Sequence, residues 1–448
     1  MLTFAAAVHA HGAMKMTPYL QAVTTNSVYV LVECDSTSAV SAQYGPTTGY
    51  GSVATTESTA TTTASPVTYV HKVKLTGLVP NSVYHYRVTQ GGTIYSSDHS
   101  FTSAALPGAS FRFAWMADCR TGTTIHNNIA GRMKAANPRF CLYGGDLCAD
   151  GSYSAFKNEF FTTNELALDA VTPFFNAPGN HEGWTQNTQA FTQSPASGSA
   201  TQAYYSFDYG DLHCVNVNSE VSYSVGSAQY NFVQTDLSTS TKTWKIAYFH
   251  KSAYVAGGHG EDADMKTMTT NLFEPYGVDL VLTGHSHFFQ HNLVNGLNHY
   301  VIGAAGAPLV DPTTASYTIM SAKVYEYAIL DFTPTTLHMT VHRDDGTLLD
   351  TLDLVTCAAA ARTKPDGTIV DITEGSIVTL VPTTEAKVFY AQDADGTSGI
   401  RVETNGTRPP VGARVRIRGT LGTKPNGERA ILNATVAPRA RARPRSAA

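Results

Sequence analysis

The sequence predicts a multidomain chain with an N-terminal β-sandwich, a central α/β domain and a small C-terminal β-barrel. The length, 448 residues, is enough for about two to four domains. Residues 17–105 carry short strand patterns, and residues 108–356 alternate apolar strands with helix-compatible stretches. Residues 361–436 return to short strands separated by turn signals. These three changes of pattern define the predicted domains.

The composition is typical of a globular protein with few surface charges. Hydrophobic residues make up 42% of the chain and charged residues 15%. A net charge of −5 gives no overall field that would attract nucleic acid or an anionic membrane, so we expect neither partner. No stretch approaches the roughly 20 apolar residues of a transmembrane helix.

Residues 1–16 are predicted to be a signal-peptide remnant or a disordered segment. An apolar run is followed by a small-residue site at 8–10, although the basic start of a signal peptide is missing. We therefore expect a secreted, periplasmic or cell-surface protein. None of the six cysteines forms a CxxC pair, which argues against a zinc ribbon. Buried free thiols are expected, with a Cys119–Cys148 bond left open as an alternative.

The front domain, residues 17–105, is predicted to be a β-sandwich. Residues 27–33 are rich in β-branched and aromatic side chains, and residues 71–88 have the pattern of a strand, a turn and a strand. The Ser/Thr-rich stretch 55–65 is expected to be a loop. Four residues resemble the tyrosine-corner region of a fibronectin-III-like sandwich: Leu78, Pro80, Tyr84 and Tyr86.

In the central domain, apolar strands lead into polar residues. Residues 111–117 and 139–143 run into Asp118 and Asp146, with the helix-compatible stretch 123–136 between them. Two later apolar strands each lead to a histidine. Strand, helix and strand in succession indicate α/β layering, and open α/β sheets place ligands beyond the carboxyl ends of their strands. We therefore expect these polar residues to meet at one sheet edge.

Five blocks of potential metal ligands follow one another along the chain. They are Asp118, Gly145-Asp146, Gly179-Asn180-His181-Glu182, Phe249-His250 and Gly284-His285-Ser286-His287. Carboxylate and amide oxygens combined with imidazole nitrogens suit zinc, manganese or iron. Two such cations about 3.5–4 Å apart can hold a phosphate and its attacking water in line. The pattern predicts two divalent or trivalent ions, with Fe, Zn and Mn as candidates.

The order of these blocks resembles that of the calcineurin-like metallophosphoesterases. The front domain and residues 204–219 and 244–287 resemble the purple acid phosphatase branch. The resemblance covers residues 17–356. It implies an α/β/β/α sandwich for the central domain and phosphoester hydrolysis by a hydroxide that the metals hold.

The resemblance also implies a role for each residue. The first metal would be bound by Asp118 and His287, the second by Asn180, His250 and His285, and Asp146 would bridge them. His181 would contact a phosphate oxygen or protonate the leaving group. Glu182 either orients His181 or caps the segment that follows.

Two positions depart from the family pattern. Many metallophosphoesterases have a ligand histidine where this chain has Arg120, and purple acid phosphatases have a ligand tyrosine where it has Ala149. The first metal is therefore expected to have fewer protein ligands and no tyrosinate-to-iron colour. Arg120 either donates to a phosphate oxygen as a catalytic residue or pairs with a local carboxylate. Both alternatives stay open.

Weaker candidates surround this set. His259 and Tyr254 are candidate substrate contacts, although an exposed loop histidine and a packed aromatic ring are the default interpretations. His291 and Gln290 are candidates for orienting a metal ligand. His126 is expected on a helix near the rim of the site.

The C-terminal block is predicted to form an OB-like barrel. Its expected strands are 376–381, 387–392, 399–402, 414–420 and 430–436. The tail, residues 437–448, alternates Arg, Ala and Pro without an apolar face, which predicts disorder.

The function predicted from these features is that of an acid-phosphatase-like phosphomonoesterase acting on a small-molecule phosphoester. The OB-like barrel favours one alternative, a phosphodiesterase or nucleotide-directed esterase on the same scaffold. The departures at Arg120 and Ala149 favour another, a surface binding protein with a degenerate metal site. The natural ester, the metals and the oligomeric state stay open at this stage.

Overall fold

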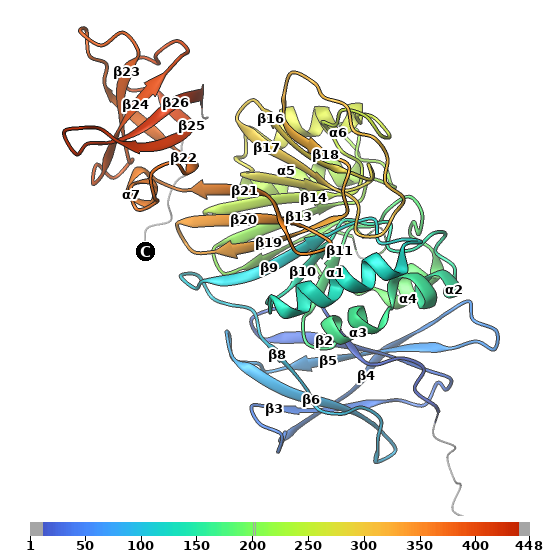
Figure 1. Ribbon diagram of the computed structural model, residues 1–448. Helices are drawn as coiled ribbons and strands as arrows, with labels where there is room; N and C mark the ends of the chain where they lie inside the picture. The colour runs from blue at the N-terminus through green and yellow to red at the C-terminus, as the bar shows by residue number, and fades with distance from the viewer. Residues whose placement is uncertain (1–11, 200, 202, 439–448) are drawn as a thin grey trace, which may run out of the picture.

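The computed structural model describes residues 12–199, 201 and 203–438 (Figure 1). Most of the predicted signal-peptide remnant and of the basic tail lies outside these residues. Three β-rich units follow one another along the chain, drawn in blue, in cyan through orange, and in dark orange to red. The predicted multidomain architecture, with a β-rich front unit and a C-terminal barrel, is present.

The front unit consists of two antiparallel sheets. β2 (Ser27–Cys34) pairs with β5 (Tyr69–Thr76) in one sheet, and β3 (Ser41–Gly45) pairs with β6 (Val83–Gln90) in the other. The remaining strands are β1 (Tyr19–Gln21), β4 (Ser52–Thr61), β7 (Thr93–Ile94) and β8 (His99–Thr102). Inward-facing apolar side chains from both sheets share one core. The Tyr84 hydroxyl accepts a hydrogen bond from the backbone N–H of Val79 at 2.9 Å, which fixes the turn before β6.

The prediction of a loop at residues 55–65 is wrong, because β4 covers most of that stretch. β4 pairs with β3 through Thr55 and with β5 through Thr59. Its side chains are mostly exposed, so it lacks the apolar alternation by which a strand is recognised. Threonine is β-branched and suits extended backbone. The composition that suggested a loop is therefore that of a solvent-facing strand.

The central unit contains two sheets packed face to face. The first sheet runs in the order β11 (Phe174–Asn176), β10 (Cys141–Tyr143), β9 (Phe111–Met116), β19 (Glu326–Phe332), β20 (Thr336–Arg343), β21 (Leu348–Val355). The second runs in the order β12 (Tyr205–Tyr209), β13 (Leu212–Val217), β14 (Trp244–Phe249), β15 (Leu280–Thr283), β17 (Leu297–Ile302), β16 (Phe289–Val294), β18 (Thr318–Ala322). β9, β10 and β11 are mutually parallel, and so are β13, β14, β15 and β17.

Helices cover the outer faces of both sheets. On the first sheet lie α1 (Thr123–Ala135), α2 (Tyr153–Ala155), the π-helix η1 (Phe156–Phe160), α3 (Thr163–Asp169) and α4 (Gln186–Phe191). On the second lie α5 (Ala228–Thr239), α6 (Ala263–Met268) and the π-helix η2 (Thr269–Phe273). Figure 1 shows α1 and α3 between the first sheet and the front unit. There the Tyr86 hydroxyl donates to the Ala170 carbonyl at 2.8 Å.

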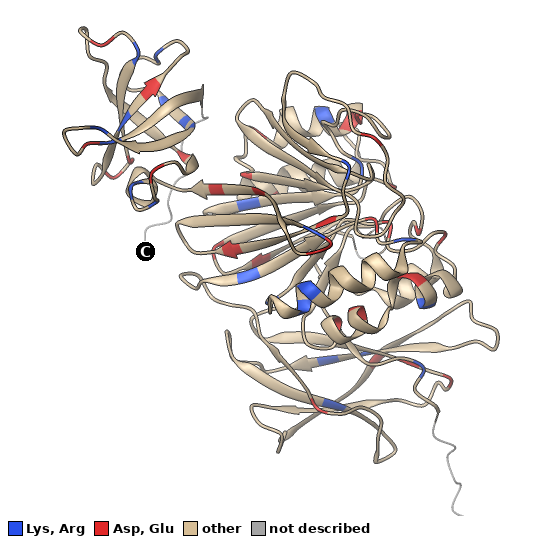
Figure 2. Ribbon diagram, in the orientation of Figure 1, with Lys and Arg blue, Asp and Glu red and all other residues tan. Residues whose placement is uncertain are grey.

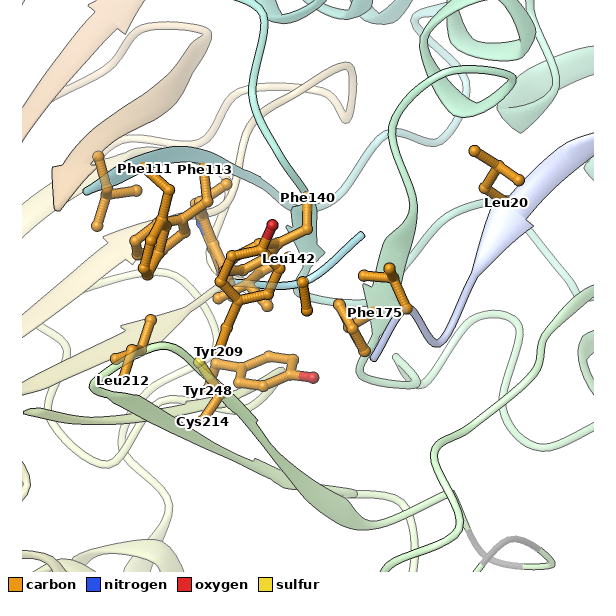
Figure 3. Packing of buried hydrophobic residues seen from close by; sticks show 14 of the residues in the cluster. Leu20, Phe111, Phe113, Phe140, Leu142, Phe175, Tyr209, Leu212, Cys214 and Tyr248 are labelled. Atoms are coloured by element: carbon orange, nitrogen blue, oxygen red, sulfur yellow. The ribbon is translucent and has the colours of Figure 1, made fainter. Parts of the chain in front are cut away.

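The core between the two sheets is aromatic, as Figure 3 shows. The ring of Phe140 stacks on Phe113 with centroids 4.9 Å apart and meets Tyr209 of the other sheet at 4.7 Å. Trp115 meets Tyr248 edge-on at 6.2 Å. Such rings bury large apolar areas and interlock in preferred geometries. This packing holds the strand ends of both sheets in fixed relative positions.

The C-terminal unit is a closed five-stranded barrel. Around it run β22 (Ile369–Leu380), β23 (Val388–Gln392), β24 (Gly399–Thr404), β26 (Arg429–Pro438) and β25 (Arg414–Thr423), and β25 pairs again with β22. Helix α7 (Ala358–Arg362) leads into it. The barrel has a hydrophobic core of its own.

The cysteines of the chain are all free, and Cys119 and Cys148 are both buried. The alternative of a bond between these two is therefore wrong. Among the described residues, no helix combines the length and apolar character needed to cross a bilayer.

Candidate metal centre

The predicted ligands gather at the carboxyl ends of the parallel strands. Asp118 follows β9, Asp146 follows β10 and Asn180 follows β11. In the second sheet, His250 comes directly after β14, and His285 follows β15. Parallel strands present these ends at a common edge, and the face-to-face packing brings the two edges together. Hydrogen bonds from Asp118 N to Gly145 O, 2.9 Å, and from Gly284 N to His250 O, 3.2 Å, fix neighbouring loops to each other.

Four side chains converge around His250. Its Nε2 lies 3.1 Å from Asn180 Oδ1, 3.3 Å from Asp146 Oδ1 and 3.1 Å from His285 Nδ1. The His250 and Asp146 side chains are almost completely buried. These four donors, two nitrogens and two oxygens, form a compact set of the kind that transition metals prefer.

A second group of side chains lies on the other side of Asp146. His287 Nε2 is 3.6 Å from Asp118 Oδ1. Arg120 Nε lies 3.3 Å from Asp146 Oδ2, and Arg120 Nη2 lies 3.2 Å from His287 Nε2. The guanidinium therefore lies between two of the residues predicted to bind the first metal.

The residues present fit a metal ion. Asp118, Asp146 and His250 each offer a ligand atom, and these atoms lie within 4.8 Å of one another. Asp118 Oδ1 is buried and accepts no hydrogen bond within the described parts of the chain. Burial and the nearby charge of Asp146 raise the pKa of Asp118 well above its usual value. Two carboxylates buried this closely are unfavourable unless a cation offsets their charge.

Backbone carbonyls fix the tautomers of two histidines. Nδ1 of His250 donates to Gly144 O at 2.8 Å, and Nδ1 of His287 donates to Pro308 O at 2.9 Å. In each ring the Nε2 lone pair is then directed into the centre, as in metal-binding histidines held by an outer partner. Burial lowers the pKa of His287 to about 4, and burial together with the charge of His250 lowers that of His285 to about 2. Both rings are therefore neutral, the form that binds metal.

Strained backbone aims the ligands. Asp118, Asp146 and His285 have φ values of 59°, 52° and 71°, a region that residues with a side chain seldom adopt. In this conformation His285 N–H donates to Asp118 Oδ2 at 2.8 Å. Strain of this kind clusters at functional sites.

Two motif glycines are explained by close approach to the carboxylates. A Cβ on Gly284 would lie 2.3 Å from Asp118 Oδ2, and one on Gly179 would lie 2.3 Å from Asp146 Oδ1. Both distances are far below any real contact, so a side chain at either position would displace a predicted ligand.

Two glutamates position the loops of the site, and of these the sequence pointed only to Glu182, as a residue that orients His181 or caps the following segment. Glu182 is fully buried and accepts hydrogen bonds from Gly179 N at 2.8 Å and Leu147 N at 3.1 Å. It therefore joins the loop of Asn180 to the loop of Asp146. Glu159, in η1, accepts from Thr121 N at 3.0 Å and Ala149 N at 2.9 Å. The spacing of Glu159 from the ligand motifs gives no indication of this role in the sequence.

The remaining candidate residues differ in whether they lie beside the metal centre. His181 Nδ1 donates to Ala149 O at 2.6 Å, and its Nε2 lies 3.8 Å from Asp146 Oδ2. His259 is exposed, yet its ring stacks on His285 with centroids 4.2 Å apart, so it lies beside the centre. The Tyr254 ring packs against His299 at 4.9 Å, and its contact with substrate stays a prediction.

Three of the weaker candidate residues have structural roles. His126 is fully buried and bonds Phe160 O at 2.9 Å, so its placement at the rim is wrong. His291 lies between Asp350 and Asn298, at 3.0 Å from each. Gln290 supports the His259 loop by accepting from Ala256 N at 2.8 Å.

Comparison with known families gives the same assignment. Residues 18–103 match the purple acid phosphatase N-terminal domain, and residues 120–289 match the calcineurin-like phosphoesterase domain. The chain therefore contains a calcineurin-like phosphoesterase domain behind a purple acid phosphatase N-terminal domain. The predicted resemblance is therefore confirmed. The matched phosphoesterase region contains most of the metal-centre residues described above.

Curated relatives of this chain include plant and bacterial proteins. It is 24% identical over 330 residues to probable inactive purple acid phosphatase 1 of Arabidopsis thaliana, covering 59% of this chain and 53% of that protein. It is 27% identical over 282 residues to purple acid phosphatase 15 of the same plant, covering 53% and 52%. An uncharacterized Mycobacterium tuberculosis protein is 26% identical over 317 residues, covering 60% and 58%. The chain thus spans little more than half the length of these relatives.

Solved structures share the fold. Purple acid phosphatase PPD1 from yellow lupin seeds has a TM-score of 0.66 at 19% identity, covering 77% of this chain and 74% of that one. PhoD has a TM-score of 0.55 at 12% identity, covering 89% and 94%. Because the names of some relatives include the word inactive and those of others do not, likeness alone does not decide whether this chain hydrolyses phosphoesters.

Proposed function

We propose that this chain is a metal-dependent phosphoester hydrolase of the acid-phosphatase-like, phosphomonoesterase type. The observation that supports this most directly is the convergence of Asp146, Asn180 and His285 on Nε2 of His250, which lies 3.3, 3.1 and 3.1 Å from their ligand atoms. The His250 ring is already held in the tautomer that directs Nε2 toward these atoms. A buried carboxylate, an amide oxygen and two imidazole nitrogens facing one point form a set of donors that suits a metal ion.

The two predicted metal positions differ in the side chains around them. We propose that Asn180, His250, His285 and Asp146 hold one ion, with Fe, Zn and Mn as candidates. The other position, beside Asp118 and His287, is the one that Arg120 approaches. A metal bound in this centre would lower the pKa of a coordinated water to about 7, which supplies a nucleophile near neutral pH.

His181 is proposed as the acid that protonates the leaving group. Its Nδ1 hydrogen is committed to the Ala149 carbonyl, so Nε2 is the atom free to exchange a proton on the side of Asp146. The side chain keeps 31% of its exposure, which leaves room for a leaving group to reach it. A positioned histidine typically contributes about 10²–10⁴-fold to such a step.

Arg120 and His259 are proposed as substrate contacts. The Arg120 guanidinium can donate to the phosphate oxygens on which negative charge develops. His259 stacks on His285 and is exposed to solvent, as expected of a side chain at the entrance to the centre. The expected substrate is a small-molecule phosphoester.

The finer structural assignments also remain our proposals. They are a fibronectin-III-like fold for the front unit, an OB-like fold for the barrel, and a secreted, periplasmic or cell-surface location. The location depends on residues 1–10, which lie outside the described residues. Figure 2 shows both basic and acidic segments on the barrel strands, so its surface does not favour the nucleotide-directed alternative.

A pair of chromogenic esters separates the proposed function from its alternatives. We expect p-nitrophenyl phosphate to be hydrolysed with a kcat/KM at least about tenfold above that for bis(p-nitrophenyl) phosphate. A preference for the bis-ester would replace the proposal with the phosphodiesterase alternative. If neither ester is hydrolysed and elemental analysis finds no metal after reconstitution, the chain is the surface binding protein instead.

A further inference from the structure

The position between Asp146 and His287 already contains a cation, the guanidinium of Arg120. We propose that Arg120 takes the place of the first metal ion, so that the centre binds one metal per chain, at Asn180, His250, His285 and Asp146. This inference rests on the proposed function, because it assumes that the centre binds metal at all.

Arg120 contacts two of the three residues predicted to bind the first metal, Asp146 and His287. Its Nη2 lies 3.2 Å from Nε2 of His287, the ring atom that the Pro308 carbonyl leaves available for a ligand bond. Its Nε lies 3.3 Å from Asp146 Oδ2, the oxygen facing away from His250. Arg120 therefore forms a hydrogen bond with the His287 atom and an ion pair with the Asp146 oxygen.

The first metal position also has fewer protein ligands than the family pattern supplies. The family's histidine after the first aspartate is replaced by Arg120 itself, and the family's tyrosine by Ala149. The backbone at Ala149 is already used, since its N–H donates to Glu159 and its carbonyl accepts from His181. At the second position, Asn180, His285 and Asp146 all lie within contact distance of His250, so the four predicted ligands are together. The loss of ligands is therefore confined to the side that Arg120 occupies.

The charge of Arg120 also disfavours a metal ion at the first position. An arginine side chain stays protonated in proteins, so its positive charge is permanent. A divalent ion bound to Asp146 Oδ2 and His287 Nε2 would lie directly against the guanidinium. Like charges at that separation repel strongly where water is excluded, and the Arg120 side chain is only 14% exposed. The guanidinium by itself offsets the charge of Asp146 without this repulsion.

The loop that carries Arg120 is fixed from several sides. Cys119 N–H donates to Asp146 O at 3.0 Å, and Thr121 N–H donates to Glu159 at 3.0 Å. Gly122 N–H donates to the Arg120 carbonyl at 2.9 Å. A Cβ on Gly122 would lie 2.1 Å from Gly306 O, so the next segment packs closely against this loop. The backbone that presents the guanidinium is therefore held in one place.

Metal stoichiometry tests the inference without depending on activity. The full-length protein is stripped with a chelator, dialysed against Mn²⁺ and analysed for Mn per chain, with electron paramagnetic resonance on the same sample. We expect one Mn per chain and the spectrum of an isolated ion. Arg120→His removes the guanidinium and restores a nitrogen ligand, so it should bind two Mn per chain with a spin-coupled spectrum, as for ions about 3.5–4 Å apart.

Arg343→His is the matched control, because it makes the same substitution at the partly exposed last residue of β20 and should stay at one Mn. Two Mn in the natural protein, or one Mn in a folded Arg120→His variant, would overturn the inference. If the natural protein binds no Mn, and no Zn or Fe when it is dialysed against those ions instead, the proposed function is overturned and the inference with it. If Arg120→His does not fold, the stoichiometry and spectrum of the natural protein still decide between one ion and two.

Discussion

Replacing Asp146 by alanine is expected to abolish phosphoester hydrolysis and tight metal binding together. Asp146 Oδ1 lies 3.3 Å from His250 Nε2 and accepts the His181 N–H at 2.9 Å, while Oδ2 faces Arg120. Its removal takes a ligand from the metal and leaves the guanidinium without its carboxylate. We expect kcat/KM for p-nitrophenyl phosphate to fall by at least about 10⁴-fold, as when a central member of a catalytic unit is removed. Metal content is measured on the same sample by elemental analysis.

Asp150→Ala provides the matched control for this substitution. Asp150 lies four residues further along the same loop, is exposed, and accepts a hydrogen bond from Ser152 N. Its variant should keep both turnover and metal. Asp146→Asn retains the shape of the side chain and should still lose activity, which separates loss of the ligand charge from loss of the fold. Normal turnover in either Asp146 variant contradicts the metal assignment.

Replacing Arg416 by alanine is expected to destabilise the barrel by about 3–5 kcal/mol, the usual cost of leaving a buried charge without its partner. Arg416 Nε and Nη2 donate to the two carboxylate oxygens of Asp371 at 2.7 and 3.0 Å, and both side chains are nearly fully buried. Nη2 also donates to the Asp279 carbonyl, just before β15, at 3.3 Å. Because this arginine ties the barrel to the sheet that carries His285, the loss should appear as a separate, earlier unfolding transition.

Urea unfolding followed by intrinsic fluorescence and circular dichroism measures this difference. Arg362→Ala, on the exposed side of α7, is the control and should change the free energy of unfolding by less than about 0.5 kcal/mol. An Arg416→Ala curve that superimposes on the Arg362→Ala curve would show that the ion pair does not stabilise the barrel.

The sequence was sufficient to locate the strands that carry the metal ligands. The predicted strands 111–117 and 139–143 contain β9 and β10, which lead to Asp118 and Asp146. Strands buried on both faces are recognisable because they are continuous apolar runs. Placing polar residues at their carboxyl ends required no knowledge of long-range contacts.

Other features depend on contacts that local pattern does not encode. β4 is a strand without an apolar face, so its hydrophobicity resembles that of a loop. Glu159 reaches the Arg120 loop from a π-helix, and nothing in its spacing from the motifs indicates this. His259 was expected in an exposed loop and is exposed, but its stacking on His285 follows only from how the loop folds back.

The contacts of Arg120 also could not be predicted from local sequence pattern, although Arg120 lies beside a ligand motif. The sequence left open whether this residue binds phosphate or pairs with a carboxylate. The structure places its guanidinium against both Asp146 and His287, so it pairs with one predicted ligand and donates to another. Only the spatial order of the loops after β9, β10 and β15 could reveal this arrangement.

The most direct test of metal-dependent hydrolysis is removal and restoration of the metal. The purified full-length protein is stripped with a chelator and assayed with p-nitrophenyl phosphate before and after addition of Zn²⁺, Mn²⁺ or Fe²⁺. The account predicts that the stripped protein loses activity and that at least one of these ions restores it in proportion to the metal bound at the centre. Full activity in protein that elemental analysis shows to be free of metal would contradict it.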